Sequence, residues 1–391
     1  MKSQNLRLYF IDAIRAWAIL MMLQGHFIDG LLDPVYRDDT NIIYLTWKFF
    51  RGITAPVFFT VSGFIFMYLL VKENKAVNIK NPRVRKGIRR GLMLIGIGYL
   101  LRLNIFGLFG GYINSSFYLV DVLHCIGLSI LFLIGIYYYS SHRKSYTLPL
   151  ILGIVGIFSF LFEPVYAKLS YSYFPEFIAN YFTKTNGSVF TIFPWFGYAS
   201  LGAFMAILFN RYKNVSHLYA KAIFLTLSIG TILTFFSSRI LLYFFQLTQI
   251  QIFADVFNNN YLFIRFGNVL MLFAIFMLLR NIISSKLILN IGKSTLYIYV
   301  IHFIILYGSF TGFGLYRYLH HSINPFYTIG GAIIFLITVT YLSLLYGKNK
   351  VFIINTLKSF GLDMYHKANQ KYFDLKPQIT KILKRLGLSK N

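Results

Sequence analysis

The stretch that decides the fold is residues 8–32, which read LYFIDAIRAWAILMMLQGHFIDGLL. It is apolar apart from a few polar side chains, and it is long enough for a helix to cross about 30 Å of hydrocarbon. Asp12 and Arg15 interrupt the run and no small-residue cleavage site follows it, so we do not expect a cleavable signal peptide. The stretch therefore predicts a retained transmembrane helix.

Similar apolar runs recur along the whole chain. Hydrophobic residues make up 57% of the sequence and charged residues only 13%, and the mean hydropathy is +0.61. A soluble domain usually carries about 25% charged residues. The sequence therefore predicts an all-α, polytopic transmembrane helical bundle of about ten spans. The predicted spans are residues 8–32, 49–71, 91–109, 119–140, 147–164, 190–210, 221–247, 261–280, 294–312 and 326–347.

The charge distribution predicts the orientation of these spans. The net charge is +26, but the basic residues gather in short segments between apolar runs, so we expect no nucleic-acid partner. If the N-terminus is inside, most of the 38 Lys and Arg residues fall in inner segments, among them 72–90, 211–221 and the tail. We therefore expect both termini in the cytoplasm and an integral, multi-pass protein of a bacterial inner membrane.

The tail differs from the rest of the chain. We predict a transmembrane domain at 1–347 and a basic amphipathic cytoplasmic tail at 348–391, which would lie on an anionic inner leaflet. A loosely ordered tail is the alternative. Cys125 is the single cysteine, so no intrachain disulfide can form. We expect no metal site, and assembly as a homodimer stays open.

Ionisable residues inside the membrane are the candidates for function, because each costs roughly 2.5–3.5 kcal/mol at the bilayer centre. The first span carries Asp12, Arg15, His26 and Asp29, which fall within about a 100° arc of one helix. Asp12 and Arg15 can pair near the cytoplasmic end, where a structural ion pair is one interpretation. His26 lies roughly 16 Å further along the axis, in the outer half of the membrane.

Other spans bring polar groups to the same depth. These are Arg51, Arg102, Asp121 and His124, and with His26 and Asp29 they can converge on one outer-half pocket. A histidine beside a carboxylate is the usual arrangement of an oriented general base. Each histidine can equally be a packing residue. His302 lies near the middle of the ninth span and can line the same cavity.

Two segments outside the spans allow two interpretations each. The inner loop contains Arg83, Arg85, Lys86, Arg89 and Arg90, which set the topology and can also bind the phosphates of a cofactor. Segment 163–190 is rich in Tyr and Phe, typical of an interfacial aromatic belt or of a platform for stacking sugars. No Walker loop, Rossmann glycine pattern or serine elbow is present.

Several motifs together resemble a known family. They begin with Arg7, Asp12, Arg15 and His26 and continue with TAPVFFTVSG at 54–63, RKGIRRG at 85–91, DVLHCIG at 121–127, FPWFGY at 193–198 and GKSTLYIY at 292–299. In this order they resemble the heparan-alpha-glucosaminide N-acetyltransferase-like membrane proteins, which are relatives of acyltransferase family 3. The resemblance covers about residues 7–305.

The resemblance implies transfer of an acetyl or other acyl group from cytoplasmic acyl-CoA to an amine or hydroxyl of a glycan or lipid-linked acceptor outside. Residues 33–48 contain no histidine, although the lysosomal sugar acetyltransferases have their proposed catalytic histidine in that loop. The base would then be His26 or His124, oriented by Asp29 or Asp121. Arg51 or Arg102 would stabilise the oxyanion.

The same interpretation assigns acyl-CoA binding to a second set of residues: Asp12, Arg15, Arg83, Arg85, Lys86, Arg89, Arg90 and His302. Two other classes of function remain open. One is a secondary transporter or channel, which also uses intramembrane Asp, His and Arg. The other is a non-catalytic membrane partner protein.

Overall fold

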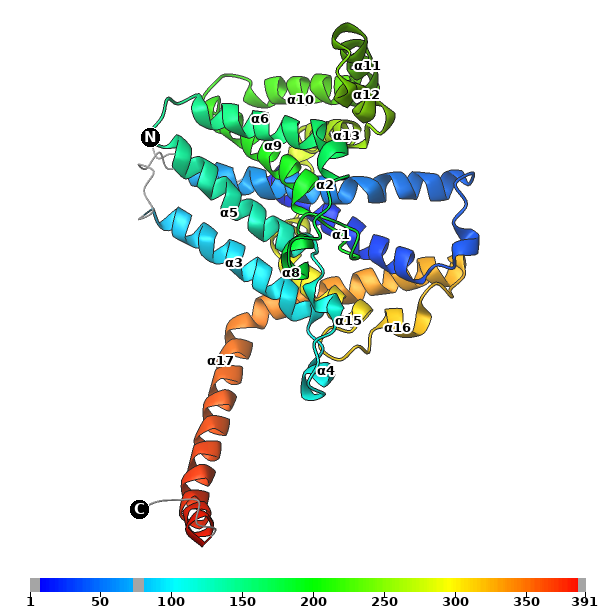
Figure 1. Ribbon diagram of the computed structural model, residues 1–391. Helices are drawn as coiled ribbons and strands as arrows, with labels where there is room; N and C mark the ends of the chain where they lie inside the picture. Colours follow the sequence, from blue (N-terminus) through cyan, green and yellow to red (C-terminus); the bar gives the residue numbers. More distant parts are fainter. Residues whose placement is uncertain (1–7, 73–80, 386–391) are drawn as a thin grey trace. The chain divides into compact units, whose positions relative to one another are not determined.

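The computed structural model describes residues 8–72 and 81–385 (Figure 1). Within these residues the chain is helical and forms no β-strand. Two isolated β-bridges join Leu32 to Ile323 and Asn104 to Phe310. The prediction of an all-α, membrane-type bundle is confirmed.

The longer helices are α1 (Tyr9–Leu31), α2 (Ile42–Val71), α3 (Pro82–Arg102), α5 (Val122–Ser140), α6 (Thr147–Leu161), α9 (Ile192–Arg211), α10 (Leu218–Phe235), α11 (Ser237–Thr248), α12 (Gln251–Asn258), α13 (Tyr261–Leu278), α14 (Lys286–Lys293), α15 (Thr295–Tyr307) and α17 (Pro325–Arg385). Short helices connect them: α4 (Ile105–Phe109), α7 (Glu163–Tyr166), α8 (Glu176–Ala179), α16 (Leu315–Leu319) and the 3₁₀ turns η1 (Pro34–Tyr36), η2 (Ser115–Tyr118) and η3 (Leu279–Asn281).

Polar capping residues fix where several of these helices begin. Asn41 accepts hydrogen bonds from the backbone of Ile43 and Tyr44, so α2 starts at Ile42 rather than near residue 49 as predicted. Asn81 caps α3 and Asp121 caps α5 in the same way. The cap of α5 matters for function, because it fixes the backbone around a charged cavity residue.

Every predicted span coincides with at least one helix, but the helices differ in how well they suit a membrane. Seven of the described helices are long and apolar enough to cross one, and an eighth crossing is possible if α14 and α15 act as a bent pair. The other two of the ten predicted spans fall on helices that suit a membrane less well. Helix α6 has only 15 residues, and α3 begins with a basic turn. The count of ten spans therefore stays a prediction.

Two predicted spans are interrupted. The span at 221–247 is broken at Phe236 into α10 and α11. The span at 294–312 is α15, which meets α14 at an angle of 68° and ends at Gly308 in the left-handed conformation. Hydropathy averaged over a whole span does not reveal such breaks, because the few polar residues at them, among them Ser237 and Lys293, lie within longer apolar runs.

Glycines allow the central helices to approach closely. A Cβ on Gly63 of α2 would clash with the Ala199 carbonyl of α9, and a Cβ on Gly202 of α9 would clash with the Thr60 carbonyl of α2. Two backbones can meet at this distance only where the side chains are hydrogen atoms. Helices α3 and α5 also lie side by side (Figure 1). Around this core, α1 packs against α2, α14 and α15.

The chain divides into two compact units, residues 1–340 and residues 341–391. The first unit contains every helix from α1 to α16 and the beginning of α17. The second unit is the continuation of α17 through Arg385.

Candidate active site

A cavity of about 780 Å³ lies in the first unit, within the range of ligand sites. Residues of α1, α2, α3, α5 and α15 line it. We call the end lined by Arg15 and Arg90 the Arg15 end. The other end, the Asp29 end, is lined by His26, Asp29, Arg51, Arg102 and Asp121.

The helix period explains this arrangement. Arg15 and Asp29 lie on the same face of α1 and are about 21 Å apart along its axis, at 1.5 Å per residue. Arg90 and Arg102 lie about 18 Å apart on α3. Two helices therefore each contribute a charged group to both ends of one cavity.

His26 pairs with a residue from the far end of the sequence. Its Nδ1 lies 3.1 Å from Nε2 of His302 on α15, and the His302 side chain is fully buried. The rings of Tyr299 and Tyr307 pack against His302, and Tyr307 also packs against His26. His302 is not among the cavity-lining residues. The structure therefore places His302 behind His26, and its assignment to acyl-CoA binding stays a prediction.

Asp29 contacts three other segments of the chain through its carboxylate and its backbone carbonyl. Its carboxylate forms an ion pair with Arg51 of α2. Its backbone carbonyl accepts a hydrogen bond from Arg37 over 2.8 Å and lies 3.2 Å from Nε2 of His321. The last turn of α1 is therefore tied to three other segments of the chain.

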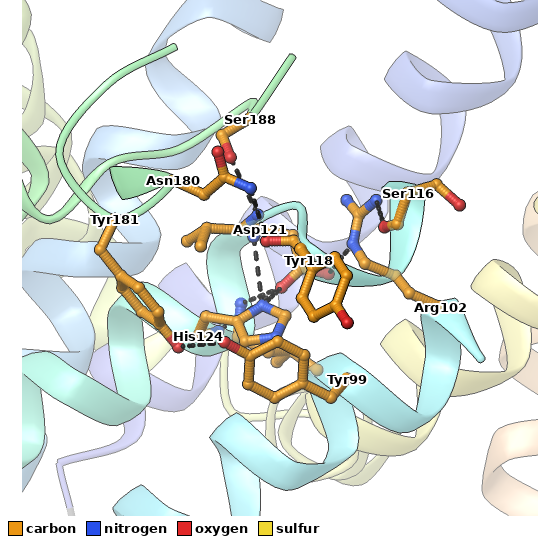
Figure 2. A network of polar contacts seen from close by, with 11 residues as sticks. Tyr99, Arg102, Ser116, Tyr118, Asp121, His124, Asn180, Tyr181 and Ser188 are labelled. Carbon is orange, nitrogen blue, oxygen red and sulfur yellow. Dashed lines mark hydrogen bonds and ion pairs between the residues drawn. The ribbon is translucent and has the colours of Figure 1, made fainter. Parts of the chain in front are cut away.

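Asp121 joins an arginine and a second histidine, as Figure 2 shows. Its Oδ1 lies 2.9 Å from Nδ1 of His124, and its Oδ2 lies 3.6 Å from Nε of Arg102. The His124 ring is fully buried and packs edge-on against Tyr99 with ring centroids 4.3 Å apart. Arg102 and Asp121 line the cavity, but His124 does not. His124 therefore contacts the carboxylate from behind rather than facing a ligand.

The Arg15 end is built from three helices. Arg15 lies 3.8 Å from Asp12 and donates a hydrogen bond of 2.8 Å to Thr295 of α15. Of the basic cluster on α3, Arg90 lines the cavity. The other members lie outside the lining: Arg83, Arg85, Lys86 and Arg89. Arg90 shares its face of α3 with Leu94 and Leu101, which also line the cavity.

Some lining residues were given no role from the sequence. Thr295 and Tyr299 lie in the GKSTLYIY motif and Trp195 lies in FPWFGY, so the resemblance pointed to them without assigning a function. Nε1 of Trp195 and Oγ of Ser309 are buried and have no hydrogen-bond partner among the described residues. Buried polar groups are usually paired, so these two are candidates to bind a ligand.

The arrangement suits proton transfer next to a developing negative charge. A histidine at the Asp29 end can exchange a proton, and two arginines there carry positive charge that can stabilise an oxyanion. Within residues 8–72 and 81–385, no group of three or more His, Cys, Asp and Glu side chains is arranged to hold a metal ion.

Fold and cavity together define a polytopic α-helical membrane protein with a cavity of substrate size, which is largely apolar and has charged side chains at both ends. Residues 7–248 match the family model described as heparan-alpha-glucosaminide N-acetyltransferase, catalytic. The chain belongs to this family, which implies acetyltransferase activity at a membrane, and the family resemblance noted in the sequence is confirmed. No curated protein has significant sequence similarity to the chain. The match includes α1, α2, α3 and α5, whereas α15 with His302 lies beyond it.

Proposed function

We propose that the chain transfers an acetyl or other acyl group from acyl-CoA to an amine or hydroxyl of a glycan or lipid-linked acceptor. The donor enters at the Arg15 end of the cavity and the acceptor at the Asp29 end. The observation that carries the proposal is that one continuous cavity is lined by Arg15 and Arg90 at one end and by His26 and two arginines at the other.

The lining agrees with the shape and charge of acyl-CoA. Guanidinium groups form strong charge-assisted hydrogen bonds with phosphate, and Arg15 and Arg90 are available at the Arg15 end. Between the two ends the lining includes apolar side chains, among them Ile19, Phe58 and Leu94. An apolar passage suits the pantetheine arm, which would carry the thioester toward His26.

His26 acts as the general base in this proposal. When His26 Nδ1 donates to Nε2 of His302, the His26 Nε2 lone pair is the one available to the acceptor. His26 takes the proton as the acceptor nitrogen or oxygen bonds to the thioester carbon. Arg51 or Arg102 stabilises the oxyanion. The carbon–sulfur bond then breaks, and His26 returns the proton to the CoA sulfur in a direct transfer.

The orientation in the membrane is part of the proposal. With both termini in the cytoplasm, as the basic residues suggest, the Arg15 end faces the cytoplasmic pool of acyl-CoA. The Asp29 end then faces outward, across a bacterial inner membrane. The tail at 348–391 would rest on the anionic inner leaflet.

The decisive experiment incubates the purified protein in nanodiscs with labelled acetyl-CoA and glucosamine, a probe suggested by the family's description. Release of CoA thiol together with label on the amino sugar supports the proposal. Transport of an unmodified solute in proteoliposomes, without thiol release, would support the transporter alternative instead.

A further inference from the structure

A second cavity lies in the segment that connects α6 to α9. Its volume is also about 780 Å³, and it shares no lining residue with the first. Polar groups of several kinds line it, including hydroxyl, amide, carboxylate and ammonium groups. Six of the lining residues are Lys168, Ser172, Phe174, Glu176, Thr185 and Asn186.

The charges here are balanced. Lys168 and Glu176 are the charged lining residues, and Lys168 also lies 3.8 Å from Asp255. A phosphate or sulfate site would need several cations and a lipid-tail site would need an apolar lining. Each hydroxyl has one donor and two acceptor sites, so the lining pair Thr183 and Thr185, 3.0 Å apart, uses one O–H on its mutual hydrogen bond and keeps the other O–H for a ligand. This chemistry matches a neutral ligand rich in hydroxyl groups.

A stack of three aromatic rings lies beside these polar groups. Phe182 stacks on Tyr171 with centroids 5.7 Å apart and on Phe174 with centroids 6.5 Å apart. Tyr171 and Phe174 both line the cavity, and the Phe174 side chain is 52% exposed. A half-exposed ring at the end of a stack offers an apolar face to the C–H face of a pyranose ring.

A short, anchored segment of the chain contributes lining residues to both cavities. Asn186 lines the second cavity, whereas Val189 and Phe190 line the first. The Asn186 amide donates to Asn180, and Asn180 donates to the carbonyl of Tyr118. Three residues of chain span at most about 11 Å, so Asn186 and Val189 bring the linings of the two cavities within that distance of each other.

Figure 2 shows how this anchoring reaches the active-site network. The Ser188 hydroxyl accepts a hydrogen bond of 3.0 Å from the backbone N–H of Val120, the residue before Asp121. Asn180 and Ser188 are both buried. The segment that carries Asn186 and Ser188 is therefore anchored to the backbone on either side of Leu119, next to Asp121.

We propose that the second cavity is a carbohydrate subsite, which binds a neutral sugar unit of an oligosaccharide whose reacting unit lies at the Asp29 end. The position of the reacting unit rests on the proposed function. Binding of sugar in the second cavity does not. The chain would then prefer an oligosaccharide to a monosaccharide as acceptor.

The binding test uses N-acetylglucosamine oligomers of one to four units, which have no free amine to acetylate. Calorimetry on the full chain in nanodiscs compares Phe174→Ala with Tyr173→Ala, its neighbour, which is 94% exposed and outside the lining. We expect Phe174→Ala to weaken binding of the tetramer about 5- to 30-fold, because the ring loses its buried contact with the sugar. Tyr173→Ala should bind like the wild type.

A second variant tests the polar side of the subsite. Glu176→Gln keeps the size of the side chain and removes its charge, and we expect tetramer binding to weaken about 10-fold. No tetramer binding by the wild type, or equal weakening by Phe174→Ala and Tyr173→Ala, would overturn the subsite. Acetylation of glucosamine is measured separately. If it fails while the Phe174 effect on tetramer binding persists, the proposed function is wrong and the subsite stands.

Discussion

Replacement of His302 tests whether this residue orients the proposed base His26. The fully buried His302 ring supplies the only hydrogen-bond partner found for His26 among the described residues. His302→Leu keeps an apolar side chain of similar size but removes the acceptor, so Nδ1 of His26 is left buried and unpaired. Such a group costs about 1–3 kcal/mol, which corresponds to a loss in kcat of roughly 5- to 150-fold if the penalty falls on the oriented base.

His302→Gln serves as the matched variant, because its amide can still accept a hydrogen bond from His26. We expect it to recover much of the kcat that His302→Leu loses. The assay follows CoA release with a thiol reagent at saturating glucosamine, and acyl-CoA affinity is measured separately by calorimetry. Thermal unfolding of each variant shows whether the fold is kept.

We expect both variants to bind acyl-CoA like the wild type, because His302 does not line the cavity. A clear rise in the acyl-CoA Kd with kcat unchanged would refute it. That result would support the sequence-based assignment of His302 to acyl-CoA binding. Equal kcat in the wild type and in His302→Leu would show that the histidine pair has no part in catalysis.

Three further predictions concern the first cavity and the packing of α3 against α5 beside it. His26→Ala should lower kcat about 10²- to 10⁴-fold without changing the Kd for acyl-CoA, which turnover assays and calorimetry measure. Turnover near that of the wild type would show that His26 is not the base. Arg90→Gln should weaken acyl-CoA binding about 10-fold and Arg89→Gln should change it little, because Arg90 lines the cavity and Arg89 does not. Equal effects of the two substitutions would favour binding by the whole basic cluster. Gly98→Ala should lower the unfolding temperature, because the new Cβ would lie 2.5 to 2.8 Å from atoms of the His124 ring. Overpacking of this kind costs about 1–3 kcal/mol. An unchanged unfolding temperature would mean that the ring can move aside.

The helical period allowed part of the candidate site to be predicted. Arg15, His26 and Asp29 share one stripe of the first span in the sequence, and all three line the cavity. This succeeded because residues on one helix have fixed relative positions. The sequence also suggested that Arg102 and Asp121 converge on the same end, and both line it.

The sequence could not separate the residues that face the cavity from those that lie behind it. Asp121 and His124 are three residues apart and both were candidates for the site, yet only Asp121 lines the cavity. The difference arises from α3, where Gly98 leaves room for the His124 ring and Tyr99 covers it. Likewise, nothing within segment 82–90 distinguishes Arg90 from Arg89, because the packing of α3 against α5 decides which face of α3 lines the cavity.

By itself, the sequence determined the class of fold and the family, because hydropathy, span length and local motifs depend on residues that are close together in the chain. It also determined the polar stripe of α1 for the same reason. Only the tertiary structure decided which other helix contacts this polar stripe at His26. His26 and His302 are 276 positions apart, and their contact depends on the 68° bend between α14 and α15 and on the packing of both helices against α1. No local pattern encodes such a contact, because it results from the close packing of many side chains around a cavity that no single segment defines.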